Sequence, residues 1–222
     1  MELSDEELKV KKEIDKLWAA NAHIEYANRG YRLQVSLKPN SLLFVGINPS
    51  YSEKDTSTDS CYSFDEESGK IHKYFNKFQD ISRKVNIQWA HIDLLFLRET
   101  DQKNVGKIID DHPDFVYKQL MISKEIIENL QPKIIVTNNT LARRLLGFDK
   151  FEKNGKSENE WINFEFKFDD SIGTHRITYN EKLENTPIFF TSMLTGQRAL
   201  DNGSYERLVW HIKFVLGKLD KR

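Results

Sequence analysis

Four short runs of mostly apolar residues alternate with amphipathic helical patterns along this chain, at residues 41–46, 89–97, 133–137 and 187–191. An apolar run of this kind is typical of a strand that is buried on both faces. Such strands alternating with helices are typical of a parallel sheet that helices cover. We therefore expect an α/β fold with three layers, α/β/α, around a central, mostly parallel sheet of four strands.

The N-terminal segment predicts a helix that packs on this sheet. Ser4 and Glu7 have the spacing of a capping box, and apolar residues then recur at helical spacing until Gly30. We expect this helix within residues 1–30. Because no repeat, low-complexity tract or linker interrupts the sequence, we expect residues 1–222 to form a single domain.

Two further patterns lie in the second half of the chain. Alternating aromatic residues between 161 and 179 predict an accessory hairpin beside the main sheet. Asp110, Asp111 and His112 resemble an acid/base cluster, but Pro113 follows them directly. Proline is favoured at the first position of a helix, so we interpret this motif as a helix start with Asp111 as its cap.

Charge and aromatic content limit the classes of function. Lysine and arginine number 33 against 34 for aspartate and glutamate, a net charge of -1. This balance excludes a protein that coats nucleic acid without specificity, although a local basic patch remains compatible with it. Fourteen phenylalanines, eight tyrosines and four tryptophans exclude a disordered chain.

Cysteine, histidine and hydropathy favour a cytoplasmic protein without a metal. Cys61 is the single cysteine, which excludes an internal disulfide and a cysteine-based metal site. No two histidines have the H-x-x-x-H spacing, so we expect no metal site and no cofactor. The chain has an acidic start and no run of 18 apolar residues, so we expect no signal peptide and no membrane association. We also expect a monomer.

Ligands of open parallel sheets bind beyond the carboxyl ends of the strands. Four polar segments follow the expected strands and should converge there: residues 46–51, 93–100, 137–140 and 191–198. The alternative is that these loops are polar only because they meet water.

The pentapeptide at residues 46–50 is the most informative of these segments. Gly46 lets another group approach the backbone closely, and Pro49 keeps Asn48 extended. The Asn48 side chain then has a fixed orientation, in which its amide can hold a water with its oxygen and a substrate with its nitrogen. The alternative is a strand cap or a turn, the commonest use of Asn-Pro.

This Gly-Ile-Asn-Pro-Ser sequence resembles the first motif of the uracil-DNA glycosylase superfamily, nearest to the mismatch-specific branch, which carries Gly-Ile-Asn-Pro-Gly. The order of the later segments is also similar, over roughly residues 41–216. These segments are a helix around Phe75, a strand ending in 93–98, the stretch 128–136 and the second-motif loop 191–198.

The resemblance implies a DNA glycosylase-like hydrolase, which flips a damaged or deaminated base out of DNA and cleaves its N-glycosidic bond. Asn48 would position the hydrolytic water, and the backbone at Gly46 and Ile47 would help to hold the base. Tyr51 or Phe64 would stack on that base. The implied partner is DNA, either single-stranded or a mismatched duplex.

Two departures from the family pattern bear on the substrate. Asp93 stands where the family commonly has an asparagine that reads a pyrimidine, and an ionised carboxylate only accepts hydrogen bonds. It would suit a base with an amino group, unless it is protonated. The second motif, His-Pro-Ser in the family, is absent from residues 192–198. Thr195, Gln197 or Arg198 would have to replace its histidine.

Two other functions remain compatible with the sequence. One is a catalytically inactive member of the same fold that binds a nucleic acid, a nucleotide or a protein. The other is an enzyme for a small nucleoside-like substrate. Arg143 and Arg144 either meet a phosphate backbone or are simply solvated at the end of a short helix. His91, inside an apolar run, is expected to be a core histidine.

Overall fold

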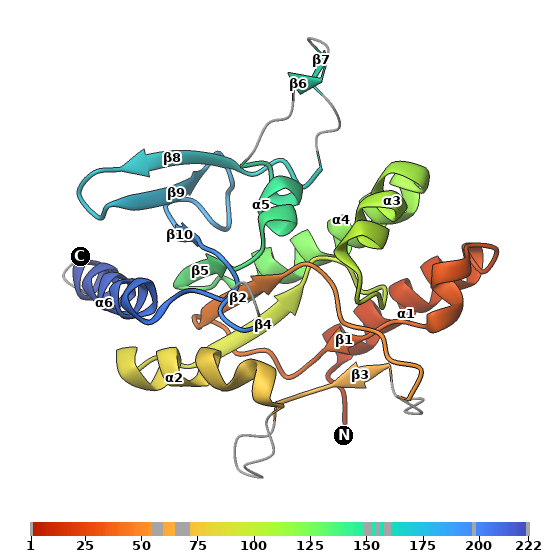
Figure 1. Cartoon of the computed structure of the whole chain (residues 1–222), viewed down its shortest axis with the longest axis horizontal. Helices are drawn as coiled ribbons and strands as arrows, with labels where there is room; N and C mark the ends of the chain where they lie inside the picture. Colours follow the sequence, from red (N-terminus) through yellow and green to blue (C-terminus); the bar gives the residue numbers. More distant parts are fainter. Residues whose placement is uncertain are drawn as a thin grey trace.

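The computed structural model describes residues 2–54, 60–64, 72–148, 152–153, 156–157, 161–196 and 199–220. It shows an α/β fold around a mixed, six-stranded sheet with the order β4-β2-β5-β10-β9-β8 (Figure 1). The strands are β2 (Leu42–Gly46), β4 (Trp89–Asp93), β5 (Ile134–Thr137), β8 (Glu165–Asp169), β9 (Thr174–Thr178) and β10 (Pro187–Phe190).

The sheet has a parallel part and an antiparallel part. Strands β4, β2, β5 and β10 pair in parallel, with Phe44 opposite His91 and Gly46 opposite Asp93. Strands β9 and β8 continue the sheet in antiparallel pairing, with Pro187 opposite Arg176. The expected hairpin therefore forms, but it extends the main sheet instead of lying beside it.

Helices cover both sides of the sheet, as Figure 1 shows. Helices α2 and α6 lie on one side, and α1, α3, α4 and α5 lie on the other. The helices are α1 (Asp5–Ala20), α2 (Asn76–Val85), α3 (Gln102–Asp111), α4 (Pro113–Leu130), α5 (Thr140–Leu146) and α6 (Asn202–Leu219), with short 3₁₀ helices η1 (Glu25–Arg29) and η2 (Lys73–Phe75).

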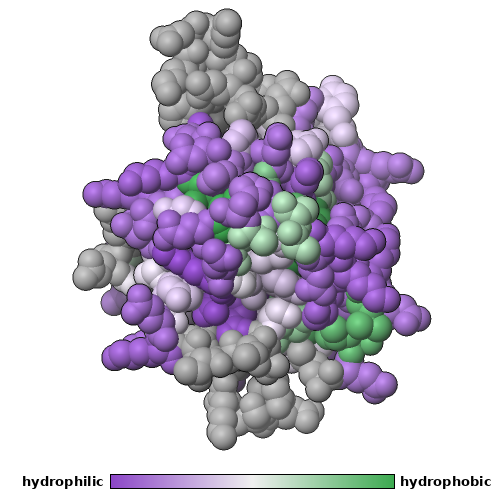
Figure 2. Space-filling model, turned by 90° about the vertical axis from the view of Figure 1, so that its right-hand side faces the viewer, coloured by the Kyte–Doolittle hydropathy of each residue, from purple (hydrophilic) through white to green (hydrophobic). Residues whose placement is uncertain are grey.

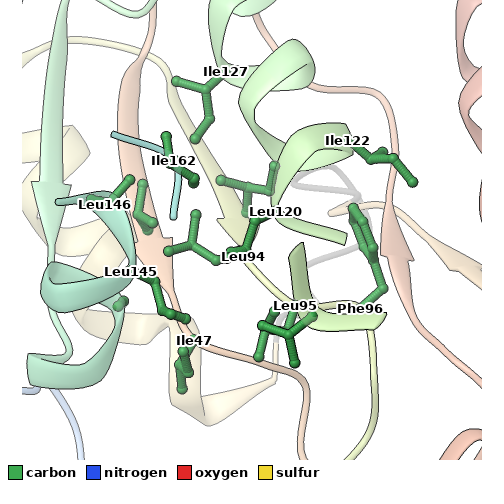
Figure 3. Packing of buried hydrophobic residues seen from close by; sticks show 14 of the residues in the cluster. Ile47, Leu94, Leu95, Phe96, Leu120, Ile122, Ile127, Leu145, Leu146 and Ile162 are labelled. Carbon is green, nitrogen blue, oxygen red and sulfur yellow. The ribbon is translucent and has the colours of Figure 1, made fainter. Parts of the chain in front are cut away.

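Strand β2 shows why the sheet needs cover on both sides. Alternate side chains of a strand point to opposite faces, so Leu42 and Phe44 enter one core while Leu43 and Val45 enter the other. All four are fully buried. Phe44 packs edge-on against Phe78 of α2, with ring centroids 4.7 Å apart. Figure 3 shows part of the other core, where residues from α4, α5 and the segment after β4 meet.

The N-terminal segment forms two pieces, of which α1 packs on α4. The capping box of Ser4 and Glu7 is confirmed. The helix ends at Ala20 instead of continuing to Gly30, because the Asn21 side chain donates to the Leu17 carbonyl (2.8 Å) and stops the helical pattern. The η1 turn follows and ends at Gly30, whose φ is 69°.

Two pairs of very short strands lie outside the main sheet. Strands β1 (Leu33–Gln34) and β3 (Cys61–Tyr62) pair in parallel, which joins the segment after η1 to the long connection after β2. Strands β6 (Glu152–Lys153) and β7 (Lys156–Ser157) form an antiparallel pair.

The predicted helix start at Pro113 is confirmed, but its predicted cap is wrong. Helix α4 begins at Pro113 with His112 in the cap position. Asp111 is instead the last residue of α3, a helix that the sequence analysis did not expect.

The surface on the side of α1, α3 and α4 is mostly hydrophilic (Figure 2). Within the described ranges, no helix combines the length and the apolar composition that crossing a membrane requires. The same ranges contain no group of three or more His, Cys, Asp or Glu side chains placed to hold a metal ion.

Candidate functional site

A cavity of about 550 Å³ lies at the carboxyl ends of the parallel strands. Each of the four segments expected to converge there contributes to its wall: residues 46–50 after β2, Asp93 and residues 99–100 after β4, Asn138 and Asn139 after β5, and Met193 after β10. The other wall residues include Arg32, Tyr62, His72, Tyr74, Phe75 and His91.

The Asp93 carboxyl group leaves no room for a side chain at residue 46, so this position requires glycine. The two residues are register partners in β2 and β4, and the Asp93 side chain lies across the Gly46 backbone. A Cβ on Gly46 would lie 2.2 Å from Oδ1 of Asp93 and 3.1 Å from Nε2 of His91. The close approach expected at this glycine is therefore made by a side chain of the protein itself.

The Asn48 side chain is held in one orientation by three backbone carbonyls. Its Nδ2 donates to the carbonyls of Glu99 (2.6 Å), Pro49 (2.9 Å) and Leu97 (3.5 Å). The reverse amide orientation would place oxygen against these three oxygens, so the assignment of nitrogen and oxygen follows from the contacts. The nitrogen is thus committed to the protein and is not available to a substrate.

The oxygen of the same amide is in the opposite situation. Oδ1 of Asn48 is buried and has no hydrogen-bond partner among the described residues. A buried acceptor without a donor costs about 1–3 kcal/mol. Because Asn48 lines the cavity, a water or a substrate that donates to Oδ1 would recover that cost.

His91 and Asp93 form a buried pair in the cavity wall. Nε2 of His91 lies 3.7 Å from Oδ1 of Asp93, and their side chains are 1% and 12% exposed. Nδ1 of His91 lies 3.2 Å from Oε1 of Gln34. With the Gln34 amide in this orientation, Nδ1 carries the proton and Nε2 is the acceptor, 3.7 Å from Asp93. Burial raises the pKa of Asp93 to about 7 and lowers the pKa of His91 to about 3. The pair therefore favours a neutral acid beside a neutral imidazole.

Two tyrosines complete the wall near this pair. Burial, with the neighbouring Asp93 carboxyl, raises the pKa of Tyr74 to about 12, although the Asn138 side chain opposes the rise. Burial also holds the pKa of Tyr62 well above its usual value. Both phenols are therefore neutral hydrogen-bonding groups at physiological pH.

Glu99 anchors the loop that holds Asn48. Its carboxylate accepts from Arg29 (2.6 Å), from the Asn104 amide (3.2 Å) and from the backbone N–H groups of Thr100 (2.7 Å) and Asp101 (2.9 Å). Burial alone would raise the pKa of Glu99, but these donors lower it below its usual value. The ionised Glu99 thus positions the carbonyl that binds the Asn48 nitrogen.

The two aromatic residues expected to stack on a base are not in the cavity wall. Phe64 packs inside an aromatic cluster, with its ring 4.4 Å from Phe75 and 4.7 Å from Trp89, nearly parallel to the latter. Tyr51 lies against two guanidinium groups, those of Arg29 (4.8 Å) and Arg98 (5.3 Å). Phe75, which does line the cavity, is the better-placed ring for stacking.

The loop expected to carry the second motif contributes an apolar side chain. Thr195 is half-buried and does not line the cavity, while Met193 does. Gln197 and Arg198 lie outside the described residues. Ile47 lines the cavity at its base and is buried in the core.

Sequence reasoning missed the part of the wall that does not follow a strand end, which includes His91 and the aromatic residues Tyr62, Tyr74 and Phe75. His91 is buried as expected, but it also lines the cavity, and its Nε2 has no hydrogen-bond partner among the described residues. A signal was present, because His91 and Asp93 are two residues apart on one strand and so share a face. Tyr62, Tyr74 and Phe75 gave no comparable signal, since the path of a long connection places them.

A comparison of the sequence with protein-family models gave no match, and a comparison with curated proteins gave none either. The function is therefore argued from the geometry of this cavity.

Proposed function

We propose that the protein hydrolyses the N-glycosidic bond of a damaged or deaminated base that is flipped out of DNA into the cavity. The observation that carries this proposal is the locked Asn48 amide, whose buried Oδ1 has no partner among the described residues. The cavity volume of about 550 Å³ falls within the range for small-molecule sites. The proposal includes the three-layer arrangement around four parallel strands that the alternation of apolar strands and amphipathic helices predicts.

In the proposed reaction, Oδ1 of Asn48 accepts a hydrogen bond from the attacking water and aims its oxygen at the sugar carbon. The new C–O bond forms as the C–N bond breaks, the bonding pair leaves with the base, and the water gives up a proton to solvent. The departing base anion needs a donor. His72 lines the cavity, and its Nδ1 accepts from the Tyr74 N–H (3.3 Å), so the proton of its neutral form lies on Nε2. We assign this N–H the role of the missing second-motif histidine.

Asp93 is the residue proposed to read the base. With its pKa raised to about 7, the carboxyl group is largely protonated in mildly acidic solution. A neutral carboxyl donates one hydrogen bond and accepts another. That pair of bonds matches the adjacent carbonyl and N–H of uracil, hypoxanthine or xanthine, which an ionised carboxylate would not match.

The test is release of free base from oligonucleotides that contain uracil, hypoxanthine or xanthine, single-stranded and in mismatched duplex. We expect release by the wild type and a loss of about 100-fold or more in Asn48→Ala, the scale of a positioned catalytic group. Asn104→Ala is the matched control. It removes one hydrogen bond to the Glu99 carboxylate, and Asn104 itself, on α3, does not line the cavity. Release that is absent from every substrate, or equal in Asn48→Ala and wild type, contradicts the proposal.

A catalytically inactive protein that binds a nucleic acid or a nucleotide in this cavity is the second candidate. The side chain of Met193 favours this candidate. Among the described residues of the loop after β10, it is the one that lines the cavity, and its thioether cannot donate a hydrogen bond to a base anion. Tight binding of a uracil-containing oligonucleotide without base release would favour this candidate.

A further inference from the structure

A second hollow, of about 490 Å³, lies at the end of β10 and the beginning of β9. We call it the basic groove and define it by Arg143, Arg207, His175, His211, Phe148 and Phe168, which all line it. Among the described residues of its lining there is no aspartate or glutamate. In a chain with a net charge of -1, two arginines without a carboxylate in the same described lining are a local departure from the average. Burial lowers the pKa of His175, so the positive charge comes from the arginines.

Aromatic rings form one wall of the basic groove. The ring of His175 lies 4.7 Å from Phe148, 5.2 Å from Phe168 and 5.7 Å from Phe190. Phe168 is 49% exposed and lies on β8, the outermost strand of the sheet. A large apolar ring exposed on an edge strand beside a hollow is a typical contact for a ligand.

The arginines approach the basic groove from two helices. The Arg143 guanidinium, on α5, lies 5.6 Å from the Phe148 ring centre. Arg207 belongs to the second turn of α6, and its Nε donates to the Gly203 carbonyl (3.3 Å), which holds its stem at the start of the helix. Both cations therefore line the same groove, and Arg143 lies beside its aromatic wall.

His211 and Gly173 form the floor of the basic groove. Nε2 of His211 donates to the Ile172 carbonyl (2.6 Å). Gly173 has a φ of +67°, and a Cβ there would lie 3.2 Å from the same nitrogen. The turn between β8 and β9 is thus held against α6 at the lining of the groove.

We propose that the basic groove binds single-stranded nucleic acid, with bases stacked on Phe168 and phosphates held by Arg143 and Arg207. Proteins that bind single strands combine these two features, a cationic groove and aromatic rings. The connection between β10 and α6 gives Met193 to the cavity and Thr191 to the groove, so both sites lie along one edge of the sheet. The inference rests on the proposed function and extends it, because it names the single-stranded DNA next to the flipped base as the ligand of the groove.

Fluorescence anisotropy with a labelled 15-residue oligothymidylate tests this inference on the full chain. We expect Phe168→Ser to weaken binding about 10-fold, the loss of one base–ring stack. We expect the double variant Arg143→Gln/Arg207→Gln to reduce the slope of log K against log salt by about 1.4, for two lost phosphate contacts. Tyr117→Ser on α4, which removes a ring that is 46% exposed, and Lys213→Gln on α6 are matched controls.

Three outcomes would overturn the inference. The first is unchanged binding in the groove variants, and the second is an equal loss of binding in the two controls. The third is competition by thymidine monophosphate at the same concentration as the oligonucleotide, which would show that the ligand is a free nucleotide. The oligothymidylate carries no damaged base, so its binding does not depend on catalysis. Groove-dependent binding without base release would reject only the proposed function, and base release without groove-dependent binding would reject only this inference.

Discussion

The cavity and the basic groove share one edge of the sheet, yet they use their polar groups in opposite ways. In the cavity, the Asn48 nitrogen and the Glu99 carboxylate are bound to the protein, and His91 and Asp93 are buried together. In the groove, Phe168 is half exposed, and the Nε of Arg207 donates to the Gly203 carbonyl at the start of α6. The comparison teaches that the polar side chains of the cavity contribute to the stability of the fold, whereas the exposed side chains of the groove contribute little to it.

The largest expected effect is on the pH dependence of stability when one member of the His91–Asp93 pair is replaced, and the intact pair is the reference. In the folded state, the pair holds one proton from about pH 3 to about pH 7. In the unfolded state, ordinary pKa values also leave one proton on the two residues between about pH 4 and 6.5. Folding then neither takes up nor releases a proton at this pair, so we expect the pair to add no slope to the unfolding free energy in that window.

When one member of the pair is replaced, the unfolding free energy should depend on pH through the remaining member. In Asp93→Asn, His91 must stay neutral in the folded state, so stability should be lost as the pH falls from about 6.5 to 4. In His91→Gln, the raised pKa of Asp93 should make stability fall as the pH rises from about 4 to 7. Each slope approaches about 1.4 kcal/mol per pH unit, or about 3–4 kcal/mol over its window. Urea unfolding at several pH values measures both; parallel profiles in wild type and variants would contradict the assignment.

The next largest effect concerns the contact between Gly46 and Asp93. Gly46→Ala should destabilise the protein by about 1–3 kcal/mol, the usual cost of overpacking a buried site. Asp93→Ala removes the atom that the new Cβ would meet, so the Gly46→Ala cost should be smaller in that background. A double-mutant cycle from urea unfolding measures this coupling. Additive costs would show that Asp93 is not the reason for the glycine.

The smallest effect is expected in the basic groove. Phe168→Ser should change the unfolding free energy by about 0.5 kcal/mol or less, because exposed substitutions rarely cost more. Thermal or urea unfolding of this variant checks the result. A loss as large as that of Gly46→Ala would mean that the groove, like the cavity, is part of the folded core, and the contrast drawn above would be wrong.

Much of the fold was predictable from local patterns. The apolar runs at 41–46, 133–137 and 187–191 contain β2, β5 and β10, and the capping box begins α1. Helix α3 was missed although Val105, Ile108 and Ile109 are spaced as one helical face and are buried. The attachment of the hairpin to β10 was not predictable, because pairing between distant strands leaves no mark on the periodicity of either one.

The candidate site was predictable only where it follows strand ends. The segment 46–50 directly follows β2, so its position is set by the sheet itself. Phe64 and Tyr62 belong to a long connection whose path depends on the pairing of β3 with β1. Side chains in such a connection are placed by contacts far away in sequence, and Phe64 accordingly enters the aromatic core instead of the cavity.

The N-terminal segment braces the cavity from outside the main sheet. Arg29 binds the Glu99 carboxylate, Gln34 orients His91, and β1 aligns the strand that carries Tyr62. A shortened protein that starts beyond residue 35 would lose all three supports at once, even though the six strands of the sheet would all be retained. Any shortened version of the protein that is meant to keep the cavity must therefore include these first 35 residues.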